Sequence, residues 1–192
     1  YNDNLLKSFN LALMAVCEGQ ALDKEFETKK NVTEEDYFSM IEKKTSYLIA
    51  MPIEIGALAY DYPLKNAKKL FNFGLFIGKA FQIQDDFLEI MSSAEIMKKS
   101  LDSDILLGKQ TYPIILCNKK DKNFIRTLIK SNKNTKTIIT EIRKFIIENK
   151  LDAEITKTIE NLYQEANNYI ETIDFKSNDL VNFVNKIKTR KK

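Results

Sequence analysis

The chain has no histidine among its 192 residues, and this absence excludes several kinds of catalytic centre. A Ser-His-Asp triad, a histidine-ligated zinc site and an imidazole general base all need a side chain that the sequence lacks. Catalysis by this chain would therefore depend on carboxylates, lysines, hydroxyl groups or a bound metal ion.

Glycine and proline are scarce, with five and three residues respectively. An all-β protein needs a turn about every 8–12 residues, and such turns use these two residue types. The apolar residues, 44% of the chain, recur instead every three or four positions, as in amphipathic helices. We therefore predict an all-α bundle of about seven or eight helices, with enough apolar material for a core.

Neither charge nor hydropathy indicates a nucleic acid or a membrane as partner. The net charge is only +3, and no apolar run reaches the roughly 18 residues of a membrane span. No signal peptide is visible. Cys17 and Cys117 each lie in an apolar run, and we expect both to be buried, reduced thiols, as in a cytoplasmic protein.

A few local signals divide the predicted helices. The first covers roughly residues 2–27, and Thr33 is the predicted N-cap of the second, where Asp36 completes a capping box. Pro52 predicts a kink or a break in the second helix. The third runs from Tyr62-Pro63 to about Met91 and is followed by a long loop over roughly residues 92–111. Shorter helices are predicted at about residues 113–118, 121–130, 135–149, 151–171 and 175–188.

Four polar side chains share one side of the third predicted helix. Gln82, Asp85, Asp86 and Glu89 are spaced i, i+3, i+4 and i+7 among large apolar residues. Crowded carboxylates repel one another unless a cation lies among them, and Mg²⁺ uses oxygen ligands to bridge carboxylates to substrate phosphates. The alternative is a solvated acidic patch, which the apolar neighbours disfavour. We predict a metal-binding face.

A cationic group lies in the middle of the second predicted helix. Lys44 shares a helix face with Met40 and Leu48, so the base of its side chain should be partly buried. Thr45 places a hydroxyl beside it. A buried ammonium destabilises the fold unless it meets an anion, so we predict an anion-binding lysine. The alternative is a lysine that extends along the helix edge to solvent.

Four further residues complete the set of candidates. Gln20 and Asp23 lie one helical turn apart where the apolar face of Val16 ends, although ordinary polar residues of a helix end are the alternative. Lys99 and Lys109 lie in the predicted loop next to the acidic helix. Diphosphate suits this combination, because its metal interacts with the carboxylates and the lysines neutralise the remaining oxygens.

These residues lie in motifs that resemble those of the trans-isoprenyl diphosphate synthases, also called polyprenyl synthetases. The segment Phe81-Gln-Ile-Gln-Asp-Asp-Phe-Leu-Glu89 resembles the second aspartate-rich motif of that family. Three further matches follow the order and spacing of the family: Gly19-Gln20-Ala-Leu-Asp23, Tyr37-Phe-Ser-Met-Ile-Glu-Lys-Lys44-Thr45, and a segment with Lys99, Asp104, Gly108-Lys109-Gln-Thr111 and Pro113.

The resemblance implies an isoprenoid-synthase-type helical bundle with Mg²⁺-dependent prenyltransferase activity. Enzymes of this family, such as farnesyl, geranylgeranyl and longer polyprenyl diphosphate synthases, condense isopentenyl diphosphate with an allylic prenyl diphosphate and release pyrophosphate in isoprenoid biosynthesis. Metal ions and lysines stabilise the charge that develops on the leaving group. The family chemistry needs no histidine, and its members are usually homodimers.

Carried over by position, the resemblance gives each candidate residue a role. Asp85 is the direct Mg²⁺ ligand, and Asp86 and Glu89 bind the metal directly or through water. Lys44, Lys99 and Lys109 hold diphosphate, Thr45 and Gln82 face the carbocation, Phe81 lines the isopentenyl site, and Gln20 and Asp23 support the metal cluster. The catalytic set implied in this way is Lys44, Thr45 and Asp85.

The sequence also departs from the family pattern. The second motif ends in Glu89 where the family usually has aspartate, and no first aspartate-rich motif or paired arginines precede Asp85. We therefore expect residues 1–192 to be the C-terminal part of a single all-α domain, without its N-terminal third. Alone, such a chain would hold half of the metal site and would be inactive.

Three other interpretations remain open. One is a non-catalytic partner subunit of a heteromeric prenyl synthase, although such a subunit has no need of Asp85, Asp86, Lys44 and Lys99. Another is a helical interaction module with a merely solvated acidic face, which the ordered motifs disfavour. A terpene cyclase shares the fold and the diphosphate chemistry but fits Lys44-Thr45 and Gly108-Lys109 less well.

Overall fold

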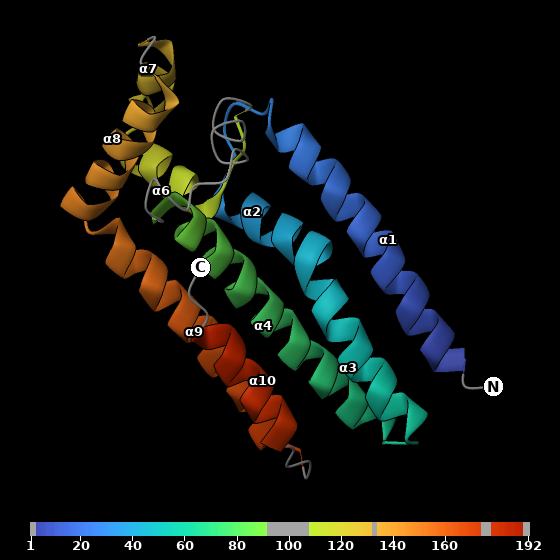
Figure 1. The fold of residues 1–192 in the computed structure, drawn as a ribbon. Helices are drawn as coiled ribbons and strands as arrows, with labels where there is room; N and C mark the ends of the chain where they lie inside the picture. Colours follow the sequence, from blue (N-terminus) through green and yellow to red (C-terminus); the bar gives the residue numbers. More distant parts are fainter. Residues whose placement is uncertain (1–2, 92–107, 132–133, 174–177, 190–192) are drawn as a thin grey trace.

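A computed structural model describes residues 3–91, 108–131, 134–173 and 178–189, and the regular structure in these ranges is helical throughout (Figure 1). Its elements are α1 (Asp3–Phe26), α2 (Glu34–Ile41), the π-helix η1 (Glu42–Ser46), α3 (Tyr47–Ala59), α4 (Leu64–Met91), α6 (Tyr112–Lys120), α7 (Phe124–Lys130), α8 (Thr135–Glu148), α9 (Leu151–Glu171) and α10 (Asn178–Lys188). Since α2, η1 and α3 follow one another without a break, they form one irregular rod. The described residues thus form eight rods, which confirms the predicted all-α bundle.

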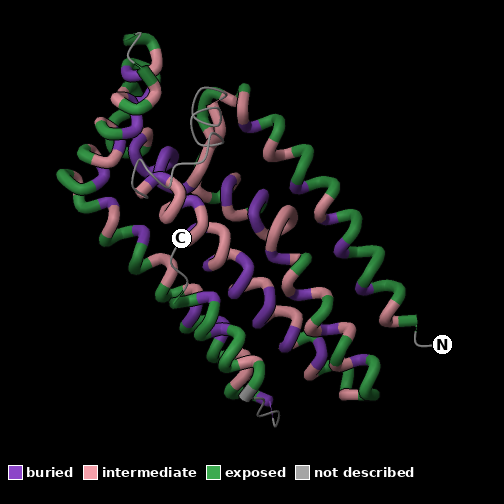
Figure 2. The backbone as a smooth tube through the Cα atoms, in the orientation of Figure 1, coloured by how far each residue is buried: buried purple, intermediate pink, exposed green. Residues whose placement is uncertain are grey.

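The central helix of the bundle is α4, which lies between the α2–η1–α3 rod and α9 (Figure 1). The α1 helix packs on the other side of that rod, and α7 and α8 lie at one end of the molecule. One apolar cluster joins α2, the C-terminal half of α4, α6 and α8, and a second joins the N-terminal half of α4 to α9 and α10. Buried residues therefore follow the inner faces of the rods, while α1 exposes most of its surface (Figure 2).

The start of α2 forms as the local sequence predicts. The Asp36 backbone N–H donates to Thr33 Oγ1 at 3.1 Å, and the Thr33 backbone N–H donates to Asp36 Oδ2 at 3.0 Å. Both halves of the capping box are thus present, with aspartate in place of the usual glutamate. The box fixes the point at which the rod carrying Lys44 and Thr45 begins.

Replacing Thr33 with alanine should therefore destabilise the chain modestly. Loss of the side-chain cap leaves one N-terminal N–H of α2 without its acceptor, so we expect the free energy of unfolding to fall by about 1 kcal/mol. Chemical denaturation of Thr33→Ala and Thr33→Ser measures this difference, because serine retains the acceptor oxygen. Equal losses in both variants would show that the cap contributes nothing.

The predicted break at Pro52 is wrong, and the irregularity lies earlier in the rod. The α3 helix continues through Pro52 to Ala59, whereas the rod widens into the π-helix η1 before α3 begins. Pro52 is exposed, so water can bond the carbonyl that lost its usual donor. Because a π-turn holds one extra residue, the face carrying Lys44 does not continue to Leu48, which is 53% exposed.

Three glycines bring neighbouring helices unusually close to the rod. A Cβ at Gly19 of α1 would lie 2.7 Å from Lys44 Cα, and one at Gly78 of α4 would lie 2.7 Å from Ser46 Cβ. One turn from Gly78, a Cβ at Gly74 would lie 3.0 Å from Ala50 Cβ. The η1 turn is therefore held between two glycine contacts, one on each side.

The two cysteines have different environments. Cys117 is buried in α6, and burial raises the pKa of its thiol from 9.0 to about 12. Cys17 is exposed, so its predicted burial is wrong. It lies on the side of α1 opposite the buried face of Ala12, Ala15 and Gly19, which packs on the rod. Both thiols are free, as expected.

The described helices were also compared with the length and hydropathy of a membrane span. None of them combines the length and the apolar character that crossing a membrane requires.

Candidate active site

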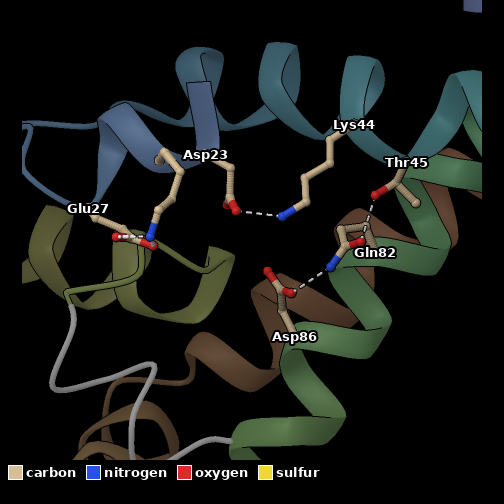
Figure 3. Close-up of polar contacts among 7 residues, drawn as sticks. Asp23, Glu27, Lys44, Thr45, Gln82 and Asp86 are labelled. Atoms are coloured by element: carbon tan, nitrogen blue, oxygen red, sulfur yellow. Dashed lines mark hydrogen bonds and ion pairs between the residues drawn. The ribbon is translucent and has the colours of Figure 1, made fainter. Parts of the chain in front are cut away.

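The centre of the candidate site is the pair Lys44 and Thr45 in η1, which reaches to the helices on both sides (Figure 3). Lys44 Nζ forms an ion pair with Asp23 Oδ2 of α1 at 2.5 Å. Thr45 Oγ1 donates to Gln82 Oε1 of α4 at 2.8 Å. The side chains of Lys44 and Asp23 are 30% and 13% exposed, so Lys44 is partly buried, as expected, and its ammonium is paired with a carboxylate of the chain itself.

The hydrogen-bond chain from Thr45 continues to a buried carboxylate. Gln82 Nε2 donates to Asp86 Oδ1 at 2.9 Å. Asp86 Oδ2 accepts a bond from the Tyr37 hydroxyl at 2.6 Å and one from the Tyr112 backbone N–H at 3.3 Å. Both carboxylate oxygens of Asp86 are therefore bonded within the protein, which fixes the orientation of the Gln82 amide.

Burial dominates the electrostatics of Asp86. Desolvation raises the pKa of its carboxyl from the ordinary 3.8 to about 6. Hydrogen bonds from Tyr37, Gln82 and the Tyr112 backbone, and the positive charge of Lys109, each lower the pKa and so limit the rise. Desolvation and the Asp86 charge hold the pKa of Tyr37 well above its ordinary value, so this hydroxyl remains a donor.

This pKa predicts how stability depends on pH. The folded chain binds a proton at Asp86 more tightly than the unfolded chain does, so the contribution of Asp86 to stability falls as pH rises from about 4 to about 6. In Asp86→Asn this dependence is absent. In metal-free buffer, the unfolding free energy of the variant relative to wild type should rise by up to about 3 kcal/mol across that interval. Denaturation curves between pH 4 and 7 test this, and a difference that stays constant with pH would contradict the account.

The remaining acidic residues of α4 lie on the same helix face as Gln82. Asp85 and Glu89 are one turn apart and are both partly buried. Lys109 precedes α6 and lies close enough to Asp86 for its charge to affect the carboxyl pKa. At adjacent residues of η1, the structure thus joins an ion pair, Lys44 with Asp23, and a hydrogen-bond chain, Thr45 with Gln82 and Asp86. Asp85, Glu89 and Lys109 lie beside them.

The residues of this arrangement can be compared with the ligands that Mg²⁺ uses. Among the described residues, no three carboxylates or cysteines gather in a group able to enclose a metal ion. Mg²⁺, however, commonly takes one or two carboxylates and completes its shell with water and substrate phosphate oxygens. Asp85 and Glu89, at i and i+4 on one helix face, are carboxylates of the kind that this open mode of binding uses. Both oxygens of Asp86 accept hydrogen bonds within the protein.

Other predicted site residues are placed differently. Gln20 is exposed, so it does not continue the buried face of α1, which runs through Gly19. Phe81 is partly buried and packs against the second apolar cluster, with Phe73 and Tyr163. Lys99, like Asp104 and most of the predicted loop at about 92–111, lies outside the described residues.

Tyr37 and Tyr112 belong to the site although the sequence predicted a role for neither. Both contact the Asp86 carboxylate, through the Tyr37 hydroxyl and the Tyr112 backbone. The signal available for Tyr37 was its position two helical turns before Lys44, on the side of the helix that carries the apolar residues Met40 and Ile41. The close contacts of Gly19 and Gly78 were missed because they depend on helix crossing, which no local pattern specifies.

The sequence and the fold both match a known class of enzymes. The family model of polyprenyl synthetase matches residues 1–146, and the chain belongs to the polyprenyl synthetase family. This confirms the resemblance drawn from the motifs.

Individual relatives agree with this assignment. A geranylgeranyl diphosphate synthase of Methanosarcina mazei is 44% identical over 100 residues, which cover 52% of this chain and 31% of that protein. A short chain isoprenyl diphosphate synthase of Methanocaldococcus jannaschii is 38% identical over 135 residues, or 69% of this chain and 41% of that protein.

Solved structures confirm the isoprenoid-synthase-type bundle. A geranylgeranyl pyrophosphate synthetase from Pyrococcus horikoshii superposes with a TM-score of 0.84 at 27% identity, covering 98% of this chain and 59% of that one. A second geranylgeranyl pyrophosphate synthase gives a TM-score of 0.86 at 25% identity, covering 98% and 61%. The chain thus spans about three fifths of these structures, and its matches to the curated relatives above cover 31% and 41% of their length.

Proposed function

We propose that the protein carrying this sequence is a trans-prenyltransferase that condenses isopentenyl diphosphate with an allylic prenyl diphosphate and releases pyrophosphate. The observation that carries the proposal is the network in which η1 joins Lys44 to Asp23 and Thr45 to Gln82, beside the carboxylates of α4. Membership of the polyprenyl synthetase family and the names of the relatives support this chemistry.

The cationic and acidic groups of the site suit an allylic diphosphate. Asp85 and Glu89 would hold Mg²⁺, which supplies positive charge to the leaving diphosphate as the carbon–oxygen bond breaks. Lys44 would bind diphosphate oxygens by exchanging Asp23 for the substrate, since its ammonium is partly buried and already paired with a carboxylate in the site. Lys109 would neutralise further oxygens, and Lys99 is proposed for the same role from the resemblance alone.

The polar chain from Thr45 suits the carbocation formed when the diphosphate leaves. The Thr45 hydroxyl donates its hydrogen bond to Gln82 Oε1, and Gln82 Nε2 donates one to Asp86 Oδ1. The Thr45 oxygen therefore has only lone pairs to present elsewhere, and lone pairs stabilise an electron-deficient carbon. In this proposal Asp86 acts through Gln82 or through water, with Tyr37 as a further donor.

The remaining assignments are proposals that follow the family. Residues 1–192 would form the C-terminal part of one all-α domain, with Gln20 supporting the metal site and Phe81 lining the isopentenyl site. We also propose a homodimer in the cytoplasm, a location with which two free thiols are compatible.

A condensation assay tests the proposal. Protein expressed from the complete gene encoding this sequence is mixed with Mg²⁺, isopentenyl diphosphate and dimethylallyl, geranyl or farnesyl diphosphate. We expect longer prenyl diphosphates by mass spectrometry, with equimolar pyrophosphate, and no reaction in EDTA. Absence of product with all three allylic substrates would refute the proposal, and product only after adding a second synthase subunit would favour the partner-subunit alternative.

A further inference from the structure

The η1 turn is connected to both neighbouring helices at consecutive residues. Glu42 and Thr45 contact α4, whereas Lys43 and Lys44 contact α1. Ser46, the last residue of the turn, is buried at the close approach of Gly78. Every residue of η1 is therefore in contact with a neighbouring helix, although only Lys44 and Thr45 belong to the candidate active site.

The contacts to α4 form two parallel connections. Thr45 bonds Gln82, and three residues earlier on both helices Glu42 forms an ion pair with Lys79. Gly78 lies next to Lys79 and lets the two backbones approach closely. Lys79 also lies over the Phe76 ring at 5.2 Å. The side chains of Lys79 and Glu42 are 17% and 35% exposed, so this ion pair is partly shielded from solvent.

Two ion pairs also connect η1 to α1, and one of them is more exposed to solvent. Lys44 pairs with Asp23, and the adjacent Lys43 pairs with Glu18 at 2.8 Å. The side chains of Lys43 and Glu18 are 36% and 57% exposed. Exposed ion pairs contribute little to stability, so this more exposed pair is a control for the Lys79–Glu42 pair.

We infer that Lys79 is a positioning residue, which through its ion pair with Glu42 holds η1 in the π-helical register that directs Lys44 and Thr45 into the site. A π-turn is less favourable than an α-helical turn and survives only where its surroundings fix it. Without the Lys79 contact, Glu42 no longer anchors the start of η1 to α4, and the turn can relax to α-helical hydrogen bonding. The side chain of Thr45 would then point away from Gln82. The catalytic consequence of this inference rests on the proposed function, whereas the structural one does not.

Amide hydrogen exchange of the chain tests the structural part. Lys79→Met removes the charge at similar length, Lys79→Arg restores it, and Lys43→Met is the matched control. In Lys79→Met, exchange at residues 45–50 should accelerate about tenfold relative to amides of α9, and the Thr45 methyl resonance should shift. In Lys79→Arg and Lys43→Met the exchange should change by less than about twofold.

Equal exchange in Lys79→Met and Lys43→Met would overturn the inference. If Lys79→Met does not fold, Glu42→Gln breaks the same ion pair while leaving Lys79 over Phe76, and the same criteria apply to it. Failure of Lys79→Arg to restore wild-type exchange would also contradict a role for the charge.

Activity of the protein from the complete gene tests the catalytic part. We expect kcat of Lys79→Met to fall about tenfold, with restoration in Lys79→Arg and no change in Lys43→Met. Altered exchange with unchanged kcat would refute the catalytic consequence alone. Altered exchange in a protein whose wild type makes no prenyl product would leave the positioning role intact and refute the proposed function.

Discussion

Replacing Asp85 with alanine is expected to lower prenyl-transfer turnover by about a thousandfold or more. Asp85 is the α4 carboxylate that we propose as the direct Mg²⁺ ligand, and its loss removes the charge that neutralises the leaving diphosphate. The measurement is kcat at saturating Mg²⁺ and substrates, in protein from the complete gene. Higher Mg²⁺ concentrations should restore little of the lost rate, because the ligand itself is absent.

Two controls sharpen this experiment. Asp85→Asn retains the shape of the side chain but not its charge, and should be nearly as inactive as the alanine variant. Asp179→Ala removes an exposed acid in the first turn of α10 and should leave turnover unchanged. Turnover of Asp85→Ala within a few fold of wild type would refute the metal role of Asp85.

Gly19→Ala is expected to destabilise the chain clearly. Its Cβ would lie 2.7 Å from Lys44 Cα and 2.8 Å from the Lys43 carbonyl carbon, so backbone must move to admit it. We expect a loss of about 1–3 kcal/mol of unfolding free energy, even though alanine favours helices over glycine by about 1 kcal/mol. Displacement of η1 should also weaken the Lys44–Asp23 ion pair.

Gly56→Ala provides the matched control for this prediction. Gly56 also lies within a helix, but a Cβ there would meet nothing within 4 Å. The alanine should therefore stabilise the chain by about 0.5–1 kcal/mol. Equal stabilisation by Gly19→Ala and Gly56→Ala in chemical denaturation would show that α1 does not pack closely on η1.

Local signals predicted the start of the site-bearing rod, but not its geometry. The capping box of Thr33 and Asp36 was predictable because all of its bonds lie within one turn. The π-turn was not, because its close contacts are with Gly19 and Gly78 on other helices, which no local pattern specifies. The same turn explains why Leu48 is exposed although simple periodicity placed it with Lys44.

In the site, too, contacts within one helix were predictable from the sequence, whereas contacts between helices were not. Helical spacing correctly placed Gln82 and Asp86 together, whereas the hydrogen bond from Thr45 to Gln82 depends on how η1 packs against α4. Spacing could not show that Asp86 would be buried and bonded by Tyr37, because that depends on how α2 crosses α4. The exposure of Gln20 has the same origin, since the buried face of α1 is set by its packing on η1.

A crystal structure of the protein from the complete gene with Mn²⁺ and pyrophosphate would test the central claim most directly. Anomalous scattering locates Mn²⁺ independently of the protein atoms. We predict a Mn²⁺ peak at direct-ligand distance from the Asp85 carboxylate, bridging to pyrophosphate, with Lys44 Nζ on a pyrophosphate oxygen in place of Asp23. Mn²⁺ and pyrophosphate bound away from Asp85 and Lys44 would contradict the account.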